Sequence, residues 1–406
     1  MTTPLPENPL AGFSRPTILQ VIPSLETGGA ERTTIDMARA IIAAGGRALV
    51  ASRGGRMVRE LEALGGEHVE MPVHSKNPIV MGLNVEHLTR LIIREKVDLV
   101  HARSRAPGWS ALAAARRTQR PFVTTYHAKV HEKPRLKVFY NSVLARGDAV
   151  IANSAFTAAR IARIHAPDAS RIFTVPRGID MQTFDPRRLD PEHVADLRAQ
   201  WGIGDRQATV FLLPARLTRW KGQMQAIEAA RQMLASHVED EFLLLLVGDA
   251  QGRKDYLTEL HAAIAKGGLA NHVFLPGHCN DMAAAYALAD IVLSPAIEPE
   301  PFGRVAVEAQ AMQRPVIVSD AGAARETVLS MENVGADLAT GLSVPAGNAS
   351  ALAKAMMTVM ELGAAARHEM GARGRHHVAA HFSLGAMCHA TLEIYARLLK
   401  PVPHQA

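Results

Sequence analysis

The chain has 406 residues, of which 48% are hydrophobic and 21% charged, a composition typical of a soluble globular protein. No uninterrupted apolar run reaches about 18 residues, the length of a membrane-spanning helix, and the two cysteines are too few for a disulfide framework or a zinc site. Basic residues outnumber acidic ones by 27 to 18 in residues 1–195, whereas acidic residues outnumber basic ones by 21 to 18 in residues 196–406. The basic excess of the first half fits an anionic partner or a solvated surface.

In the first half of the chain, short apolar runs alternate with stretches of helical periodicity. The apolar runs, which predict strands, are TILQVIPSL, RALVAS, VDLVHA, PFVTTYH and AVIANS. The predicted helices between them are residues 30–44, 86–95, 109–117 and 136–145. This alternation predicts a parallel sheet covered by helices on both faces.

The second half repeats the pattern. Its predicted strands are TVFLLPARL, EFLLLLVGD, HVFLPG, IVLSPA and PVIVSD, and its predicted helices are residues 223–235, 256–265, 282–289 and 305–312. The segment between the halves, GIDMQTFDPRRLDPEH, is rich in Pro, Asp and Arg and lacks apolar periodicity.

We therefore expect an α/β fold of two Rossmann-like, doubly wound domains that face each other across a cleft. The first domain is predicted to span residues 17–192 and the second residues 193–383, after a loose leader of residues 1–16 that lacks the pattern of a secretory signal. A helical stretch within residues 384–406 is expected to cross back to the first domain. The scarcity of cysteine fits the reducing cytoplasm.

A glycine pair follows the first predicted strand. In SLETGGAERTT, Gly28 and Gly29 precede a predicted helix, so the backbone can approach a ligand closely and the first helical amides can bind an anion or hydroxyl groups. The spacing is not GxGxxG and does not predict a dinucleotide site. The alternative is a tight turn between strand and helix.

Two cations follow the first strand of the second half. In PARLTRWKG, Arg216 stands at the predicted strand end and Lys221 just before the next helix. The planar fork of Arg and the point charge of Lys can together hold a diphosphate. The alternative is a pair of solvated surface charges.

Two carboxylates stand eight residues apart in EPEPFGRVAVEAQA. Glu300 lies in a loop stiffened by prolines, and Glu308 lies in the second turn of a predicted helix. Carboxylates repel phosphate but accept hydrogen bonds from sugar hydroxyls. A nucleotide sugar offers hydroxyls at both ends and a diphosphate between them, which the amides near Phe302, Gly303 and Arg304 would help to hold. The alternative is helix charges with no ligand.

These motifs resemble those of the retaining glycosyltransferases of family 4 (glycosyl transferases group 1), which have the GT-B fold. EPEPFGRVAVEAQA resembles the E-x7-E signature of that family, ARLTRWKG its Arg…Lys-Gly element, PSLETGGAER its glycine loop, and VPRGID its hinge-side PNGVD segment. The four motifs occur in order along nearly the whole chain. The resemblance implies transfer of a sugar from a nucleotide-diphosphate sugar, with retention of configuration and without a metal or other cofactor.

The resemblance also implies roles for individual residues. Arg216 and Lys221 would bind the donor diphosphate and stabilise it as it leaves, while Glu308 would bind the ribose and Glu300 the donor sugar. His127, in TTYHAK, matches a first-domain histidine near the reaction centre. The further residues expected at the donor site are Phe302, Gly303, Arg304, Gly248 and Gly277, and those expected on the acceptor side are Gly28, Gly29 and Arg105.

The sequence departs from the family pattern at two positions. Arg177 stands where the hinge-side segment commonly has Asn, and Arg304 stands where an aliphatic residue is frequent. A charge at Arg304 would favour an acidic sugar or a further phosphate contact, so the identity of the donor stays open.

Residues 127–148, HAKVHEKPRLKVFYNSVLARGD, mix basic and apolar side chains. The basic residues are Lys129, Lys133, Arg135, Lys137 and Arg146, and the apolar ones are Phe139, Tyr140, Val143 and Leu144. A basic amphipathic helix suits an anionic membrane face or a phosphorylated lipid glycan. We therefore expect a lipopolysaccharide, lipid-linked glycan or exopolysaccharide as acceptor, and peripheral contact with the inner face of the cytoplasmic membrane. The alternative is a solvated helix whose apolar stripe is core.

Three other functions stay open at this point. A sugar-nucleotide epimerase of the same fold would use the diphosphate and ribose sites without a separate acceptor. A glycoside hydrolase would use Glu300 and Glu308 as acid and base, but would leave Arg216 and Lys221 unexplained. A non-catalytic sugar-binding protein is the third. Nucleic acid is not expected as a partner, because the sequence has no recognised binding motif or aromatic stacking platform.

Overall fold

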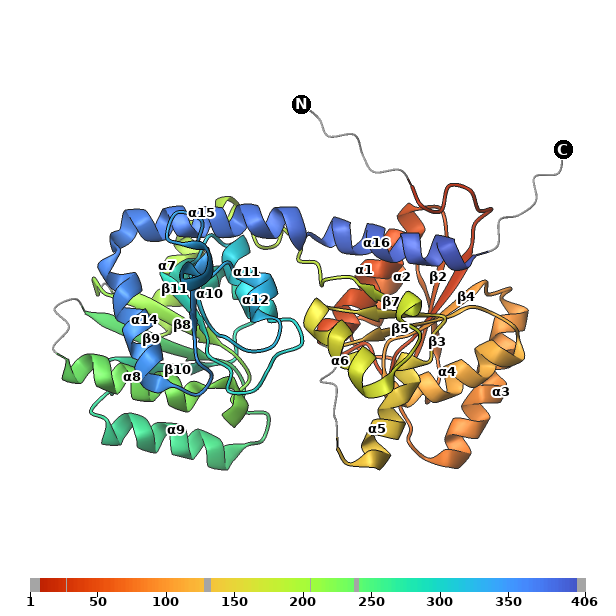
Figure 1. Ribbon diagram of the computed structural model, residues 1–406, viewed down its shortest axis with the longest axis horizontal. Helices are drawn as coiled ribbons and strands as arrows, with labels where there is room; N and C mark the ends of the chain where they lie inside the picture. The colour runs from red at the N-terminus through yellow and green to blue at the C-terminus, as the bar shows by residue number, and fades with distance from the viewer. Residues whose placement is uncertain (1–7, 27, 128–132, 205, 237–240, 400–406) are drawn as a thin grey trace. The chain divides into compact units, whose positions relative to one another are not determined.

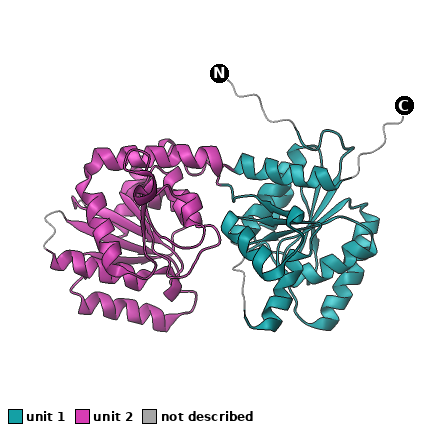
Figure 2. Cartoon of the chain, in the orientation of Figure 1, with its two compact units in different colours: residues 1–178, 384–406 teal, residues 179–383 magenta. Residues whose placement is uncertain are grey.

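The computed structural model describes residues 8–26, 28–127, 133–204, 206–236 and 241–399. The chain forms two compact units, shown in Figure 2. Unit 1 comprises residues 1–178 and 384–406, and unit 2 comprises residues 179–383. The division falls between Gly178 and Ile179, earlier than the boundary expected after residue 192.

Unit 1 is built on a seven-stranded parallel sheet with the strand order β3-β2-β1-β4-β5-β6-β7 (Figure 1). Its strands are β1 (Thr17–Val21), β2 (Arg47–Ser52), β3 (Glu67–Glu70), β4 (Leu99–Ala102), β5 (Phe122–Tyr126), β6 (Ala149–Ala152) and β7 (Ile172–Thr174). Its helices are α1 (Gly29–Ala43), α2 (Val58–Ala63), α3 (Pro78–Arg94), α4 (Arg105–Arg117), α5 (Arg135–Asn141), α6 (Ala155–His165) and α16 (Leu384–Leu398), with short 3₁₀ turns η1 (Ser142–Ala145) and η2 (Ala169–Arg171).

Helices cover both faces of the unit 1 sheet, because alternate residues of each strand point to opposite sides. Ile18 of β1 is buried in one cluster with Ile35 of α1 and Leu392 of α16. Its neighbour Leu19 is buried in another cluster with Leu88 of α3 and Ala111 of α4. The α16 helix therefore belongs to the core of unit 1, as expected.

Unit 2 is built on a six-stranded parallel sheet with the strand order β10-β9-β8-β11-β12-β13. Its strands are β8 (Thr209–Pro214), β9 (Phe242–Val247), β10 (Val273–Gly277), β11 (Ile291–Ser294), β12 (Val316–Ser319) and β13 (Gly341–Val344). Its helices are α7 (Pro191–Gln200), α8 (Gln223–Ala235), α9 (Lys254–Lys266), α10 (Met282–Leu288), α11 (Arg304–Ala311), α12 (Ala324–Thr327), α13 (Met331–Val334), α14 (Ala349–Glu361) and α15 (Gly363–His381), with 3₁₀ turns η3 (Pro186–Arg188) and η4 (Arg219–Lys221).

The unit 2 sheet is also covered on both faces. Leu213 of β8 is buried with Ala230 of α8 and Met356 of α14. Leu212, the preceding residue, is buried on the other face with Val307 of α11. The two helix-covered parallel sheets confirm the predicted fold class of two Rossmann-like units.

Several elements differ from the sequence-based expectation. α3 begins at Pro78 rather than near residue 86, because the Asn77 side chain accepts a 2.9 Å hydrogen bond from the amide of Ile79 and proline fits the first helical turn. α4 begins at Arg105 rather than at Trp109. Elements not foreseen are α2, β3, α6, β7, α7, α12, α13, β13, α14 and α15.

Part of the expected loose leader is packed. Leu10 is buried in the core of unit 1, and the Asn8 side-chain amide donates a 3.1 Å hydrogen bond to the carbonyl of Ala44. The expectation of a loose segment is therefore wrong for these residues, while residues 1–7 lie outside the described part. Among the described residues, no helix combines the length and apolar character needed to cross a bilayer.

Candidate functional site

The expected donor-site residues of unit 2 lie where neighbouring strands end. Gly277 ends β10, Gly248 follows β9, Arg216 lies shortly after β8, and Glu300 lies in the loop after β11. These four strands are neighbours in the sheet. From β8 the chain adds strands first on one side, β9 and β10, and then, from β11 on, on the other side, so the strand order switches between β8 and β11. Ligands of open parallel sheets bind outside the carboxyl ends of the strands at such a reversal. The fold thus gathers the predicted residues at the carboxyl edge of the sheet, where ligands of such sheets bind.

Lys221 and Glu300 form an ion pair at this edge. The Lys221 Nζ contacts Glu300 Oε1, and the two side chains are only 17% and 12% exposed. The same Nζ lies 4.4 Å from the ring centroid of Trp220, a cation–π distance. The pair places a carboxylate, which can accept hydrogen bonds from a sugar hydroxyl, next to a cation, which can bind a phosphate. A ligand with both groups would need both partners close together.

Close backbone packing fixes the position of Lys221. Gly222, the next residue, has φ +84°, and a Cβ there would lie 2.1 Å from the carbonyl oxygen of Pro295. The amide of Ile297 donates a 2.8 Å hydrogen bond to the carbonyl of Trp220. Only glycine allows this close approach between η4 and the loop after β11. This packing explains why glycine follows Lys221.

The backbone of Glu300 is held by the loop that follows β12. Glu300 forms a parallel bridge with Gly322, and the amide of Ala323 donates a 3.0 Å hydrogen bond to the Glu300 carbonyl. Gly322 has φ +69°, and a Cβ there would lie 2.3 Å from the carbonyl oxygen of Glu300. A side chain at Gly322 would therefore displace the loop that carries the carboxylate.

Glu308 is buried, and both of its carboxylate oxygens have partners. The Tyr286 hydroxyl of α10 donates a 2.8 Å hydrogen bond to Oε2, and Arg304 Nε donates to Oε1 one turn earlier on α11. Burial and, secondarily, the Glu308 charge raise the pKa of Tyr286 well above its usual value, so the phenol stays a donor. The described contacts do not join this cluster to the Lys221–Glu300 pair.

Two residues between the carboxylates have different surroundings. Phe302 is 5% exposed, and its ring packs edge-on against Phe382 at 5.8 Å, so its side chain belongs to the core. Gly303 precedes the first residue of α11 with φ +83° and lines a small pocket together with Glu300 and Thr327. The start of α11 therefore lies beside the Glu300 carboxylate.

Arg216 differs from Lys221 in being exposed, and within the described ranges its guanidinium has no ion pair. Its backbone carbonyl is held by Gln223 Nε2 at 3.0 Å. Gly248 packs against the same loop, since a Cβ there would lie 2.0 Å from the carbonyl oxygen of Ala215, and its amide donates a 2.8 Å hydrogen bond to the Gly277 carbonyl. These contacts explain Gly248 as a close approach between strand ends.

In unit 1, His127 follows β5 and contacts a cation. Arg177 Nη2 lies 3.0 Å from His127 Nδ1, and both atoms belong to unit 1. Burial, and then the charges of Arg177 and Arg103, lower the pKa of His127 well below its usual value. His127 is therefore a neutral imidazole at neutral pH.

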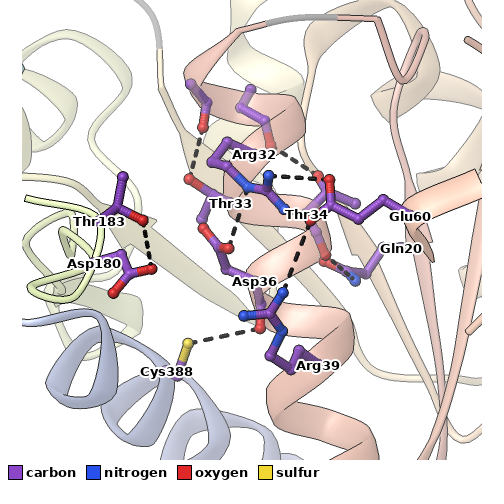
Figure 3. A network of polar contacts seen from close by, with 12 residues as sticks. Gln20, Arg32, Thr33, Thr34, Asp36, Arg39, Glu60, Asp180, Thr183 and Cys388 are labelled. Atoms are coloured by element: carbon purple, nitrogen blue, oxygen red, sulfur yellow. Dashed lines mark hydrogen bonds and ion pairs between the residues drawn. The ribbon is translucent and has the colours of Figure 1, made fainter. Parts of the chain in front are cut away.

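The predicted glycine loop leads into an anchored helix, shown in Figure 3. Gly28 has φ +153° and caps α1 without a side chain, and its carbonyl accepts a 2.9 Å hydrogen bond from the amide of Arg32. The Gly29 carbonyl accepts a 2.7 Å bond from the Thr33 hydroxyl. Arg32 also pairs with Glu60 of α2, which fixes the first turn of α1.

The remaining acceptor-side residue, Arg105, has a structural partner. Its Nη1 donates a 3.1 Å hydrogen bond to the Asn141 side chain, which ties the start of α4 to the end of α5. This contact gives Arg105 a structural role, and its expected role on the acceptor side stays a prediction. The described ranges hold no cluster of three or more His, Cys, Asp or Glu side chains suited to a metal ion.

In residues 133–148, the described part of the basic segment beyond His127, only some of the expected apolar side chains are exposed. Val143 and Leu144 are buried, so this part of its apolar stripe belongs to the core, which was the alternative interpretation. Phe139 is 60% exposed, and Leu136, which the sequence analysis did not single out, is 84% exposed. Lys129 lies outside the described residues.

Sequence reasoning missed the residues that support the carboxylates. Tyr286 is 22 residues from Glu308 in the chain and carries no local signal of this contact. Gly322 likewise lies in a different loop from Glu300. Gly222 is part of the PARLTRWKG motif, but the sequence does not indicate that it packs against Pro295.

Comparisons with known proteins agree with this arrangement. The family model described as Glycosyltransferase Family 4 matches residues 27–183, and the model described as Glycosyl transferases group 1 matches residues 195–377. A crystal structure of a glycosyltransferase from Rickettsia africae is 33% identical, with a TM-score of 0.86, and the match covers 96% of this chain and 100% of that chain.

Two further relatives carry more specific names. The crystal structure of HepE from Anabaena in complex with UDP and glucose is 25% identical, with a TM-score of 0.76, over 94% of this chain and 98% of that chain. A D-inositol 3-phosphate glycosyltransferase from Xylanimonas cellulosilytica is 29% identical over 322 residues, which are 75% of this chain and 73% of that protein. The chain therefore belongs to glycosyltransferase family 4 (glycosyl transferases group 1) and is a glycosyltransferase with the GT-B fold.

Proposed function

We propose that the enzyme transfers a hexosyl or N-acetylhexosaminyl group from a nucleotide-diphosphate sugar to an envelope glycan or glycolipid, with retention of anomeric configuration. The observation that carries the donor part is the placement of a largely buried Lys221–Glu300 pair and a buried Glu308 after neighbouring strands of one sheet. Cation and carboxylates together match a ligand that alternates hydroxyls and phosphates.

In the proposed donor complex, Lys221 and Arg216 bind the diphosphate, Glu308 binds the ribose hydroxyls and Glu300 binds hydroxyls of the transferred sugar. The amides at the start of α11 and the glycines at the strand ends provide close backbone approach. We propose that Lys221 and Arg216 neutralise the diphosphate charge, so that no metal ion is needed for donor binding. The structural relative HepE, solved with UDP and glucose, supports a UDP-sugar as the first donor to test.

The proposed reaction places the acceptor hydroxyl on the same face of the sugar as the leaving diphosphate. As the glycosidic bond to the diphosphate breaks, the acceptor oxygen forms the new bond to the anomeric carbon, and a phosphate oxygen takes the acceptor proton. Lys221 and Arg216 stabilise the charge that develops on the leaving diphosphate. Catalysis then comes mainly from positioning and fixed charges.

The acceptor proposal rests on an apolar and basic surface of unit 1, here called the α3–α5 surface and made of Ile79, Leu83, Leu136 and Phe139. These side chains are 54% to 84% exposed. Both α3 and α5 pack on α4. The Ser110 hydroxyl of α4 donates a 3.0 Å hydrogen bond to the carbonyl of Met81 in α3, and the Trp109 ring of α4 stacks on Phe139 of α5 at 5.3 Å.

Basic side chains accompany this apolar surface. Arg146 lies 5.1 Å from the Trp109 ring, and the exposed basic residues on the segments that begin α3 and α5 are Lys76, Lys133, Arg135 and Lys137. Exposed apolar groups beside cations suit the headgroup boundary of an anionic bilayer. We propose peripheral attachment to the inner face of the cytoplasmic membrane, where a lipid-linked acceptor would be met.

A second acceptor class is favoured by the curated relatives. Several of them, including the one from Xylanimonas cellulosilytica, are named D-inositol 3-phosphate glycosyltransferases. A small phosphorylated cyclitol would need the basic character of unit 1 but not its exposed apolar side chains. The two acceptor classes are therefore separable by experiment.

The first experiment is a thermal-shift panel with UDP, GDP, ADP and CMP, alone and as their sugars, at low salt with EDTA present. We expect one diphosphate nucleotide to raise the unfolding temperature, and Glu308→Ala and Lys221→Ala to reduce that shift strongly. Stabilisation that appears only when Mg²⁺ replaces EDTA would overturn metal independence. No stabilisation by any nucleotide, with or without added Mg²⁺, would overturn the donor assignment.

Membrane attachment is tested by co-sedimentation with vesicles of phosphatidylglycerol and phosphatidylcholine. Leu136→Ser with Phe139→Ser should reduce the bound fraction, and so should neutralising Lys133, Arg135 and Lys137. Ile93→Ser is the matched control, since Ile93 is 67% exposed near the other end of α3. Equal sedimentation of all variants would contradict the membrane proposal and leave a soluble acceptor such as inositol phosphate.

A further inference from the structure

We infer that Arg177 is a positioning residue, which fixes His127 as a neutral hydrogen-bond donor at Nε2. The inference rests on the proposed function, in which His127 serves at the reaction centre. It assigns a role to a residue that departs from the family pattern, and it says which of the two ring nitrogens faces the substrate.

The first step is the direction of one hydrogen bond. Arg177 Nη2 lies 3.0 Å from His127 Nδ1. A guanidinium has only donors, so Nδ1 must be the acceptor and carries no proton. A neutral imidazole with a bare Nδ1 has its single proton on Nε2. The contact therefore selects one tautomer.

The second step is that the surroundings keep His127 neutral. Burial lowers its pKa well below the usual value, and the positive charges of Arg177 and Arg103 lower it further. Arg103 is itself buried after β4, where its Nε donates a 2.6 Å hydrogen bond to Gln20. A further titratable group nearby, His101, has its own low pKa from burial, Arg103 and His127. Protonating His127 would add a cation to a basic cluster.

The third step concerns the other ring nitrogen. His127 Nε2 is a buried atom with no hydrogen-bond partner in the described part of the chain. His101, by contrast, has both ring nitrogens bonded, to the Tyr395 hydroxyl at 2.6 Å and the Thr125 hydroxyl at 2.7 Å. A buried N–H without an acceptor is unfavourable, and a substrate oxygen would satisfy it. Nε2 is thus the nitrogen available for a ligand.

The chemical consequence is that His127 donates and does not accept. With Nδ1 occupied by Arg177 and Nε2 protonated, the ring cannot take the proton of an acceptor hydroxyl. That proton then goes to the leaving phosphate, as the proposed reaction requires. The family pattern commonly has Asn where this chain has Arg177. An amide can present either its oxygen or its nitrogen, so Asn would not select the tautomer.

The test is NMR of the full-length chain labelled with ¹⁵N at histidine, with His127 assigned by comparison with His127→Asn. The expected wild-type signal is a single Nε2–H tautomer that does not titrate between pH 7.5 and 6. In Arg177→Met we expect loss of the single tautomer and a raised His127 pKa. Arg177→Lys, which also only donates, should restore the wild-type tautomer, whereas Arg177→Asn should give a mixture.

A kinetic measurement accompanies the spectra. Arg177→Met should lower kcat on the order of tenfold to a hundredfold, while calorimetric affinity for UDP stays at the wild-type value. An Nδ1–H tautomer in the wild type, or an unchanged tautomer in a folded Arg177→Met, would overturn the inference. If the tautomer responds as expected but the wild type binds no nucleotide and transfers no sugar, the proposed function fails while the role of Arg177 stands.

Discussion

The hydroxyl of Tyr286 donates a 2.8 Å hydrogen bond to Glu308 Oε2, and both side chains are buried. The bond joins α10 to the second turn of α11 and fixes the carboxylate that we assign to the donor ribose. Arg304 holds the other oxygen. The carboxylate is thus oriented before any ligand arrives, which reduces the entropy lost on binding.

Removing only this hydroxyl should weaken donor binding. Because this bond orients the carboxylate, we expect Tyr286→Phe to lower UDP affinity, and to lower the free energy of unfolding by about 1.5–3 kcal/mol, as expected for a hydrogen bond to a charged group. Isothermal calorimetry measures the change. Tyr256→Phe is the control, because Tyr256 donates a 3.3 Å hydrogen bond to Gln223 in the same unit. Equal effects of the two variants would mean that the loss reflects unit stability rather than Glu308.

The Lys221–Glu300 pair should show coupling in a double-mutant cycle. Because both side chains are largely buried, removing one partner leaves an uncompensated charge and should cost about 3–5 kcal/mol of unfolding free energy. Lys221→Met with Glu300→Gln together should be more stable than either single variant, yet should not transfer sugar. Urea denaturation followed by a transfer assay checks both parts. Additive single effects would contradict a direct pair.

Gly322 should be intolerant of a side chain. Gly322→Ala combines an unfavourable φ of +69° with a Cβ 2.3 Å from the carbonyl oxygen of Glu300, so we expect lower stability and a strong loss of turnover. Gly335→Ala is the matched control, since Gly335 has φ +80° with nothing within 4 Å of the added Cβ. The control should cost about 1–3 kcal/mol through its backbone conformation of φ 80° and ψ 164°, and should keep its activity. Similar losses in both variants would show that backbone strain alone is responsible.

Stability should fall in mild acid because of buried histidines. Burial lowers the pKa of His101 well below 6.5, so below pH 6.5 the unfolded chain binds a proton that the folded chain does not. This contribution is present above pH 6.5 and is lost as the pH falls toward the folded pKa, by up to about 1.4 kcal/mol per pH unit for each such group.

Chemical denaturation at pH 7.5, 6.5 and 5.5 measures this slope. His101→Asn removes one titrating group and should give a shallower slope than the wild type. Asp185 does not titrate in this window, since Arg187 and other neighbours keep its pKa at about 2. An identical slope in His101→Asn would contradict a depressed pKa at that residue.

The sequence predicted the sheets and the sheet edge at which the candidate site residues lie, because these depend on local patterns. An apolar run such as FLLLLV, in a chain that alternates short apolar runs with helical stretches, predicts a buried parallel strand, and a motif directly after it then lies at the carboxyl edge. For the same reason Arg216, Glu300 and Gly248 fall together at one edge. Their roles in binding stay predictions.

Elements with weak local patterns escaped prediction. β3, EHVE, is a short edge strand with only partly buried or exposed side chains, so it lacks the alternation of a strand. α15 carries several Arg and His residues and little apolar periodicity, yet it packs Val378 into the core. Contacts such as Tyr286–Glu308 depend on tertiary packing and leave no trace in either local segment.

The membership of α16 in unit 1 has a consequence for protein synthesis. Leu392 and Ile394 complete a core whose other residues, such as Ile35 and Val50, are made before any of unit 2. Domains usually fold as they emerge, N-terminal first. Here unit 2 can finish before unit 1, and the nascent first sheet keeps an apolar face exposed until α16 follows. Ribosome-bound chains halted after residue 383 should therefore recruit chaperones through unit 1.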